Sequence, residues 1–274
     1  MLNTLALVMA VALAPGAKDN ELKISNIRST YSQLGPVRVS ENKMDKVLPG
    51  DIYFVTWEME PFKVNDAGEL RLSMAMEVTD SKKNRIYKQD PTETMQVNSL
   101  GGKRVPAFAH VIIGANTAPG EHTMKVTVED LAGKRKGSFE RKFEILPPGF
   151  GMVRLHLSAD PDGVTTIPSV GVVGQLLYLN FRVIGADTAN HKKAPHVSVT
   201  MKVLDENGEP TFKKPVFVES GKEVDKDTVV VPVYLGLVLN RTGTFKVQLT
   251  ATDEKNKDIK PVQLSFVVTV HDLK

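Results

Sequence analysis

The sequence predicts an all-β protein made of two tandem antiparallel β-sandwiches, because strand-like alternation recurs along the chain and then repeats itself. The clearest strand lies in residues 242–253, where polar residues separate four apolar ones, Phe245, Val247, Leu249 and Ala251. A period of two is typical of a strand with one buried and one solvated face. Residues 119–130 show the same arrangement, with an inward series of His122, Met124, Val126 and Val128.

Four strand patterns of the first half recur in the same order in the second half. One series of inward-facing residues in the first half recurs 124 residues later in the second half: Tyr53, Val55, Trp57 and Met59 correspond to Leu177, Leu179, Phe181 and Val183. Three further patterns repeat at offsets of 125, 126 and 123 residues. Small changes in loop length explain the differences between these offsets. The sequence therefore predicts an internal duplication.

The elements of the first copy can be placed in order. A first strand is expected within residues 22–31, and Pro49 and Gly50 favour a turn before the next strand at 52–60. The apolar alternation of residues 70–78 predicts a third strand, which residues 80–84 end in a hairpin tip with a return at 85–88. A long irregular stretch follows. The remaining strands of this copy are expected in three ranges: 105–113, 120–130 and 136–146.

The second copy and the chain start complete the domain organisation. Residues 147–151 carry two prolines and two glycines and are expected to form a linker. The apolar run near the start has the length of an export signal and is too short to cross a bilayer as a helix. The expected division is therefore a signal peptide at 1–16, a sandwich at 17–146, the linker, and a second sandwich at 152–274.

Both copies resemble the immunoglobulin-like domains of secreted bacterial proteins, a group that extends to fibronectin type III and macroglobulin-type modules. The resemblance rests on the glycines before the second strand, the aspartates after the third and the alternating blocks that end in aspartate: Gly50 and Gly174, Asp80 and Asp205, Asp130 and Asp253. It covers nearly all of residues 22–271. It implies about seven strands per copy in a two-sheet sandwich, and such a fold carries no function by itself.

Composition narrows the class of protein. The chain has no cysteine, which excludes disulfides, thiol nucleophiles and thiolate metal sites. A net charge of +3 lacks the concentrated basic stripe of a nucleic-acid-binding protein. No apolar segment beyond the leader is long enough to span a membrane. A secreted or periplasmic protein with no nucleic-acid partner is expected.

No motif of catalysis or metal binding is recognisable. The pair His191 and His196 with Asp187 lies among lysines, and a zinc site needs three or four ligands on a defined scaffold. Residues 160–163 and 205–208 resemble calcium loops only superficially, since their glycine stands fourth where an EF-hand requires it sixth, and turn chemistry explains them. Nucleophile-elbow, phosphate-loop and zincin motifs are absent. We expect no catalytic residue, no metal and no cofactor.

The candidate ligand site lies at a loop end of the first copy. In sandwiches of this type the loops after the second and sixth strands share one end, and the second copy's loop end should face the linker, which leaves the first copy's end as a free tip. Two apolar and four basic residues are expected there: Phe62, Val64, Lys63, Lys134, Arg135 and Lys136. An extracytoplasmic protein or an anionic polysaccharide is the expected partner.

The sequence thus predicts a non-enzymatic exported protein that binds a ligand or acts as a structural spacer. The alternative is a non-catalytic accessory component, binding carbohydrate or protein, of an extracytoplasmic hydrolytic system. An enzyme with a site at the domain junction is a third, weaker alternative.

Overall fold

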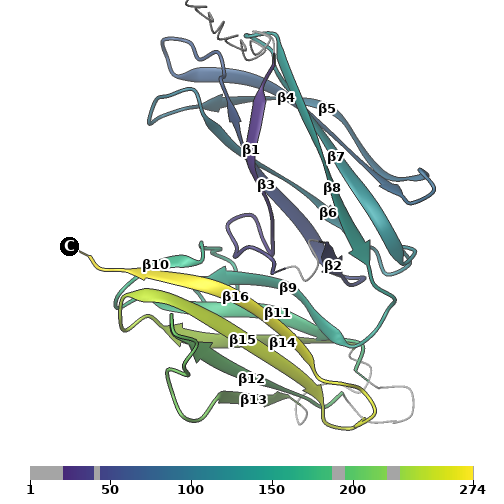
Figure 1. Cartoon of the computed structure of the whole chain (residues 1–274), viewed down its shortest axis with the longest axis vertical. Coiled ribbons are helices and arrows are strands. Elements are labelled where there is room, and N and C mark those ends of the chain that lie inside the picture. The colour runs from purple at the N-terminus through teal and green to yellow at the C-terminus, as the bar shows by residue number, and fades with distance from the viewer. Residues whose placement is uncertain (1–20, 40–43, 187–194, 221–228, 274) are drawn as a thin grey trace, which may run out of the picture.

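A computed structural model describes residues 21–39, 44–186, 195–220 and 229–273 (Figure 1). Within these ranges the regular elements are sixteen strands, so the predicted all-β class is confirmed. Residues 1–16, the expected signal peptide, lie outside the described residues. None of the described residues forms a helix long and apolar enough to cross a membrane.

The first copy consists of eight strands in two facing sheets. One sheet has the order β1-β3-β6 and the other the order β2-β8-β7-β4-β5. The strand bounds are Lys23–Thr30 for β1, Asp45–Val47 for β2, Ile52–Glu60 for β3, Glu69–Asp80 for β4, Arg85–Val97 for β5, Val105–Ile112 for β6, Gly120–Asp130 for β7 and Arg135–Ile145 for β8.

The second copy repeats this arrangement strand for strand. Its sheets have the orders β9-β11-β14 and β10-β16-β15-β12-β13. The bounds are Gly151–Ser158 for β9, Val170–Val172 for β10, Leu176–Ile184 for β11, Val197–Leu204 for β12, Val216–Ser220 for β13, Val230–Val238 for β14, Gly243–Asp253 for β15 and Val262–His271 for β16. Because the two orders match position by position, the predicted duplication is confirmed.

The strand orders are those of an immunoglobulin-like sandwich, with a three-stranded sheet facing a sheet built on the third, fourth, sixth and last long strands. Two details differ from expectation. Each copy has eight strands, because the three-residue β2 and β10 pair with β8 and β16, and these two pairings are parallel. The stretch after Lys88, expected to be irregular, continues as a strand to Val97.

Each sandwich encloses its own apolar core. The inward residues predicted for β3 are all buried, and so are those predicted for β11: Tyr53, Val55, Trp57 and Met59; Leu177, Leu179, Phe181 and Val183. Burying side chains of this size is the dominant favourable term in folding, at about 25 cal/mol per Å² of apolar surface. His122 occupies a core position against Phe143, where the second copy has Phe245, as the alternation predicts.

The first strand of each copy carries the same irregularity. Asn26 has a φ of 52° and Arg154 a φ of 57°. Both residues lie in a β-bulge, where β1 shifts register against β3 and β9 shifts register against β11. A bulge bends the strand and redirects its side chains. In the second copy this bulge lies where the two sandwiches meet.

Candidate functional site

The predicted tip of the first copy forms around one buried carboxylate. Asp130 ends β7 and has a fully buried side chain, which accepts hydrogen bonds from the backbone N–H groups of Lys63 (2.9 Å) and Gly133 (2.8 Å). These bonds join the β3–β4 loop to the β7–β8 turn, because they come from both segments. Lys63 and residues 134–136 are therefore brought together at one end of the sandwich, beside the start of β1.

The apolar part of the tip differs from the prediction. Phe62 was expected as an exposed contact, but only 1% of it is exposed, because its ring is packed into the core of the first copy. Val64 packs partly against the same core. An aromatic residue just after a strand of alternating apolar residues continues the burial of that strand, and the sequence prediction took it for a loop residue.

Fewer of the basic residues at the tip are available to a ligand than the sequence predicted. Arg135 lies 3.3 Å from Asp130, and Lys136 forms a 3.0 Å ion pair with Glu129. Lys63 and Lys134 are exposed and form no ion pair with a residue in the described ranges. The tip thus offers two lysines to an anion, where the sequence suggested a cluster of four cations.

The other candidates for chemistry are turns or core positions. Asp80 accepts backbone hydrogen bonds from Lys82 and Asn84, and the equivalent Asp205 accepts them from Asn207 and Glu209. These contacts confirm the prediction of turn chemistry for residues 205–208. Asp160 likewise accepts hydrogen bonds from the N–H groups of Val164 and Thr165, which lower the pKa of its carboxyl.

Metal binding finds no support in the part of the chain that the structure describes. No group of three or more histidine, aspartate or glutamate side chains there could hold an ion. His196 contacts the carboxylate of Glu219. Asp187 and His191, the other members of the cluster that the sequence analysis rejected as a zinc site, lie outside the described residues.

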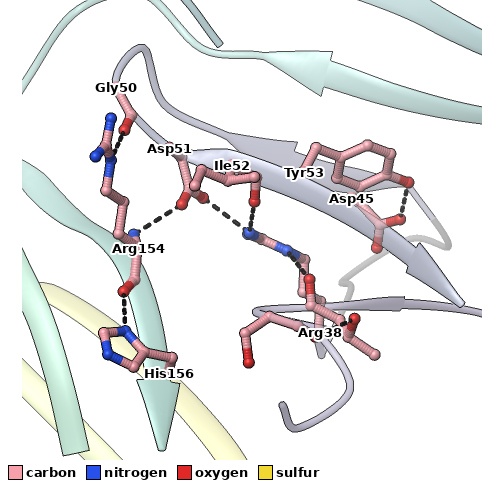
Figure 2. A network of polar contacts seen from close by, with 10 residues as sticks. Arg38, Asp45, Gly50, Asp51, Ile52, Tyr53, Arg154 and His156 are labelled. Carbon is pink, nitrogen blue, oxygen red and sulfur yellow. Dashed lines mark hydrogen bonds and ion pairs between the residues drawn. The ribbon is translucent and has the colours of Figure 1, made fainter. Parts of the chain in front are cut away.

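A polar network that the sequence did not predict joins the two sandwiches (Figure 2). Asp51, in the turn before β3, has one carboxylate oxygen 2.9 Å from the guanidinium of Arg38, in an ion pair whose side chains are 5% and 6% exposed. Its other oxygen accepts a 2.8 Å hydrogen bond from the backbone N–H of Arg154, in the bulge of β9. One buried carboxylate therefore serves both copies.

The same bulge supplies further contacts between the copies. The side chain of Arg154 donates a 2.9 Å hydrogen bond from Nε to the carbonyl of Gly50. Leu48 packs against Gly151 so closely that a Cβ at that glycine would lie 2.2 Å from Leu48 Cδ1. Tyr31 of the first copy packs against the core of the second. Burial raises the pKa of Tyr31.

The joint is bordered by a cleft of about 570 Å³. Its walls come from the first copy at Ile52 and Phe54 and from the outer face of the sheet β9-β11-β14. His156 lies in this wall, with its ring nitrogens 3.1 Å from the carbonyl oxygens of Arg154 and Gly163. We call the contacts of Leu48, Gly50 and Asp51 with the start of β9, together with the ion pair of Arg38 and Asp51, the interdomain joint.

A second buried network lies inside the first copy. The hydroxyl of Tyr53 donates a 2.7 Å hydrogen bond to Asp45, and Arg141 lies 3.5 Å from the same carboxylate. Burial raises the pKa of Tyr53, and the neighbouring Asp45 raises it further. The sequence prediction treated Tyr53 as an apolar core residue and missed its polar partners.

No family model matches the chain, and no curated protein matches it. The solved structures that resemble it include latent PorU of Porphyromonas gingivalis (12% identity, TM-score 0.36), alpha-2-macroglobulin of Escherichia coli (12%, 0.32) and the C-terminal domain of the BspA polypeptide of Streptococcus agalactiae (8%, 0.29).

The coverage of these structures is uneven. The matches cover 93%, 94% and 90% of this chain, but it spans only 20% of PorU and 23% of the macroglobulin, against all of the BspA domain. It also spans 32% of a red sea bream transglutaminase, with a TM-score of 0.28. At such TM-scores the likeness carries no argument, so the immunoglobulin-like assignment rests on the strand orders given above.

Proposed function

We propose that this is a non-enzymatic, exported protein of two immunoglobulin-like domains that binds a ligand and holds its two domains at a fixed relative orientation, as a structural spacer does. The single observation that carries the proposal is the position of Asp51. Its buried carboxylate is shared between Arg38 of its own domain and the backbone of Arg154 in the next.

Bending the protein at the interdomain joint would cost free energy. A hinge motion that separated Asp51 from Arg154 would break a hydrogen bond to a buried carboxylate, and hydrogen bonds to charged groups contribute about 1.5–3 kcal/mol. It would also expose Tyr31 and Leu48, which pack against the second copy. Domains joined by a short linker move relative to each other by default unless such an interface holds them.

Export and the identity of the partner are part of the same proposal. Export rests on the apolar leader at residues 1–16. The proposed partner of the tip is an extracytoplasmic protein or an anionic polysaccharide, and Lys63 and Lys134 are the exposed cations that support the second choice. Exposed contacts of this kind are screened within about 10 Å at 0.1 M salt, so such binding is expected to weaken as salt rises.

The spacer role is tested by measuring the distance between the domains. Because the chain has no cysteine, Ser138→Cys and Lys246→Cys place one spin label on each domain without competing sites. Electron–electron resonance should give a narrow distance distribution for the parent protein and a broad one after Asp51→Ala. Asp80→Ala, at a hairpin tip, is the control and should leave the distribution narrow. A broad distribution in the parent protein would contradict the proposal.

A further inference from the structure

A cavity in the first copy opens between two edge strands. β5 ends the five-stranded sheet and β6 ends the three-stranded sheet, and a cavity of about 690 Å³ lies between them. It continues over the outer face of β6 toward β1. In Figure 1, β5 lies at the margin of the sandwich. We call this hollow the edge cleft.

The wall that β5 contributes is polar where a sandwich interior is normally apolar. Beyond Lys88, the register with β4 places four residues of β5 opposite inward-facing residues of β4: Gln89, Thr92, Thr94 and Gln96. All four line the cleft. Apart from Thr92, which bonds the carbonyl of Asp90, their side chains form no hydrogen bond with a residue in the described ranges. The apolar residues Met95 and Val97 face outward and are exposed.

The second copy shows that the fold does not require this polarity. By the same register, Val216 stands where the first copy has Gln89, and Val218 stands where it has Thr92. Phe212 and Val218 pack against the core of the second copy. The second copy has a cavity of about 600 Å³ at the same edge, and apolar side chains such as Val216 and Phe212 line it. The first copy lines the corresponding position with amides and hydroxyls.

The floor of the edge cleft contains a polar group without a partner. Trp57 lines the cleft and is only 2% exposed, yet its indole N–H has no hydrogen-bond partner among the described residues. A buried tryptophan N–H usually finds a partner, because leaving it unpaired costs about 1–3 kcal/mol. Because this nitrogen is itself buried, an acceptor in the cleft would reach it only after the neighbouring side chains moved.

The charge of the lining indicates what kind of ligand fits. Arg28 and Glu58 are the only lining residues with full charges, and they are of opposite sign. The rest of the lining combines apolar and aromatic side chains such as Tyr87 and Phe108 with amide and hydroxyl groups, which can both donate and accept hydrogen bonds. A neutral ligand with apolar faces and a rim of hydroxyl groups matches this lining.

We propose that the edge cleft binds a neutral saccharide, with sugar rings against Tyr87 and Phe108 and hydroxyl groups bonded to Gln89, Thr92, Thr94 and Gln96. This inference rests on the proposed function in that the protein binds its ligand without converting it. It names a second site, at the side of the first sandwich and apart from the lysines of the tip.

An extended peptide is the other occupant that an open sheet edge could take. β5 is poorly suited to pair with one, because residues 90 and 91 form a bulge opposite Ala75 and Pro91 has no N–H to donate. Bulges and prolines on edge strands are devices that prevent pairing with another chain. Recognition by side chains, as a saccharide requires, is not affected by them.

The test uses the single tryptophan of the chain as its own reporter. Cellohexaose, maltohexaose and mannohexaose are each titrated into the full-length protein while Trp57 fluorescence and the heat of binding are recorded. At least one should bind and change the emission. The double variant Gln89→Val with Thr92→Val, which copies the second sandwich, should weaken that binding by about tenfold or more, since it removes two hydrogen-bonding groups.

The control is Lys88→Gln on the outer face of the same strand, which should leave the affinity unchanged. Absence of binding to all three sugars would overturn the proposal, as would equal affinity of the double variant. Binding of an alternating threonine–valine octapeptide in place of sugars would also overturn it and make the cleft an acceptor for a strand. The label distances of Asp51→Ala report separately on the spacer role, so either proposal can fail alone.

Discussion

The two copies share their backbone arrangement but differ in the chemistry of their interiors. Asp45, Tyr53 and Arg141 form a hydrogen-bonded trio in the first copy. The strand registers place Ser169, Leu177 and Phe266 at the same positions in the second, where Leu177 and Phe266 are fully buried. The same fold thus accommodates either polar or apolar side chains at these positions. The polar groups of the first copy are not demanded by the architecture, which makes them the places to look for specialisation.

The largest expected effect concerns the apolar interior of the second copy. Phe245→Ala should destabilise that domain by about 3–5 kcal/mol, because it opens a cavity in a packed core. His122→Phe, the exchange that copies the second domain into the first, should change stability by less than about 1 kcal/mol, since it removes a ring nitrogen that is buried without a partner. Urea unfolding followed by circular dichroism measures the stability of both variants. If the two substitutions destabilise their domains equally, the two positions are not equivalent.

The trio of the first copy should behave as a unit. Tyr53→Leu alone should cost about 1–3 kcal/mol, because Asp45 loses the hydroxyl that donates to it while staying buried. Combining it with Asp45→Ser and Arg141→Phe should recover most of that loss, since well-packed apolar residues often replace a buried ionic group at no net cost. Trp57 fluorescence reports on this domain alone. A triple variant less stable than Tyr53→Leu would show that the interiors are not exchangeable.

The smallest expected effect is at a turn that the copies share. Lys83 adopts a φ of 68° where the second copy has Gly208 at 82°, and both follow an aspartate that caps the turn. A residue with a Cβ is strained in this region, so Lys83→Gly should stabilise the first domain by about 0.5–1 kcal/mol. The reverse change, Gly208→Lys, should destabilise the second by a similar amount. Shifts of the same sign in the melting temperatures of the two variants would show that Lys83 and Gly208 do not occupy equivalent positions in the turn.

Alternation predicted most of the fold because burial on one face is a local signal. The inward series of β3, β7 and β15 could be read directly from residues such as Val55, Val126 and Val247, which are all fully buried. β5 was missed beyond Lys88 because its inner face is polar and its outer face ends in Met95 and Val97, so no apolar residue marks the core side. The strand that escaped prediction is also the one that lines the edge cleft.

The predicted site was less accurate than the fold, for physical reasons. Loop proximity at the tip followed from topology, and Asp130 does bring Lys63 beside residues 134–136. What topology cannot supply is whether a side chain turns inward, as Phe62 does, or whether a cation already has an acidic neighbour, as Lys136 does. The joint was invisible because Arg154 occupies an ordinary position in an alternating strand, and its positive φ leaves no mark in the sequence.

The two short parallel pairings have a consequence for how the chain resists force. β2 runs beside β8 and β10 beside β16, each over three residues at the end of its domain. Tension applied along β8 or β16 acts in the plane of these hydrogen bonds and parallel to the strands, so the bonds must slide and break together. A peeling load would open them one at a time. A domain closed in this way bears a pull along its last strand better than one directed across it.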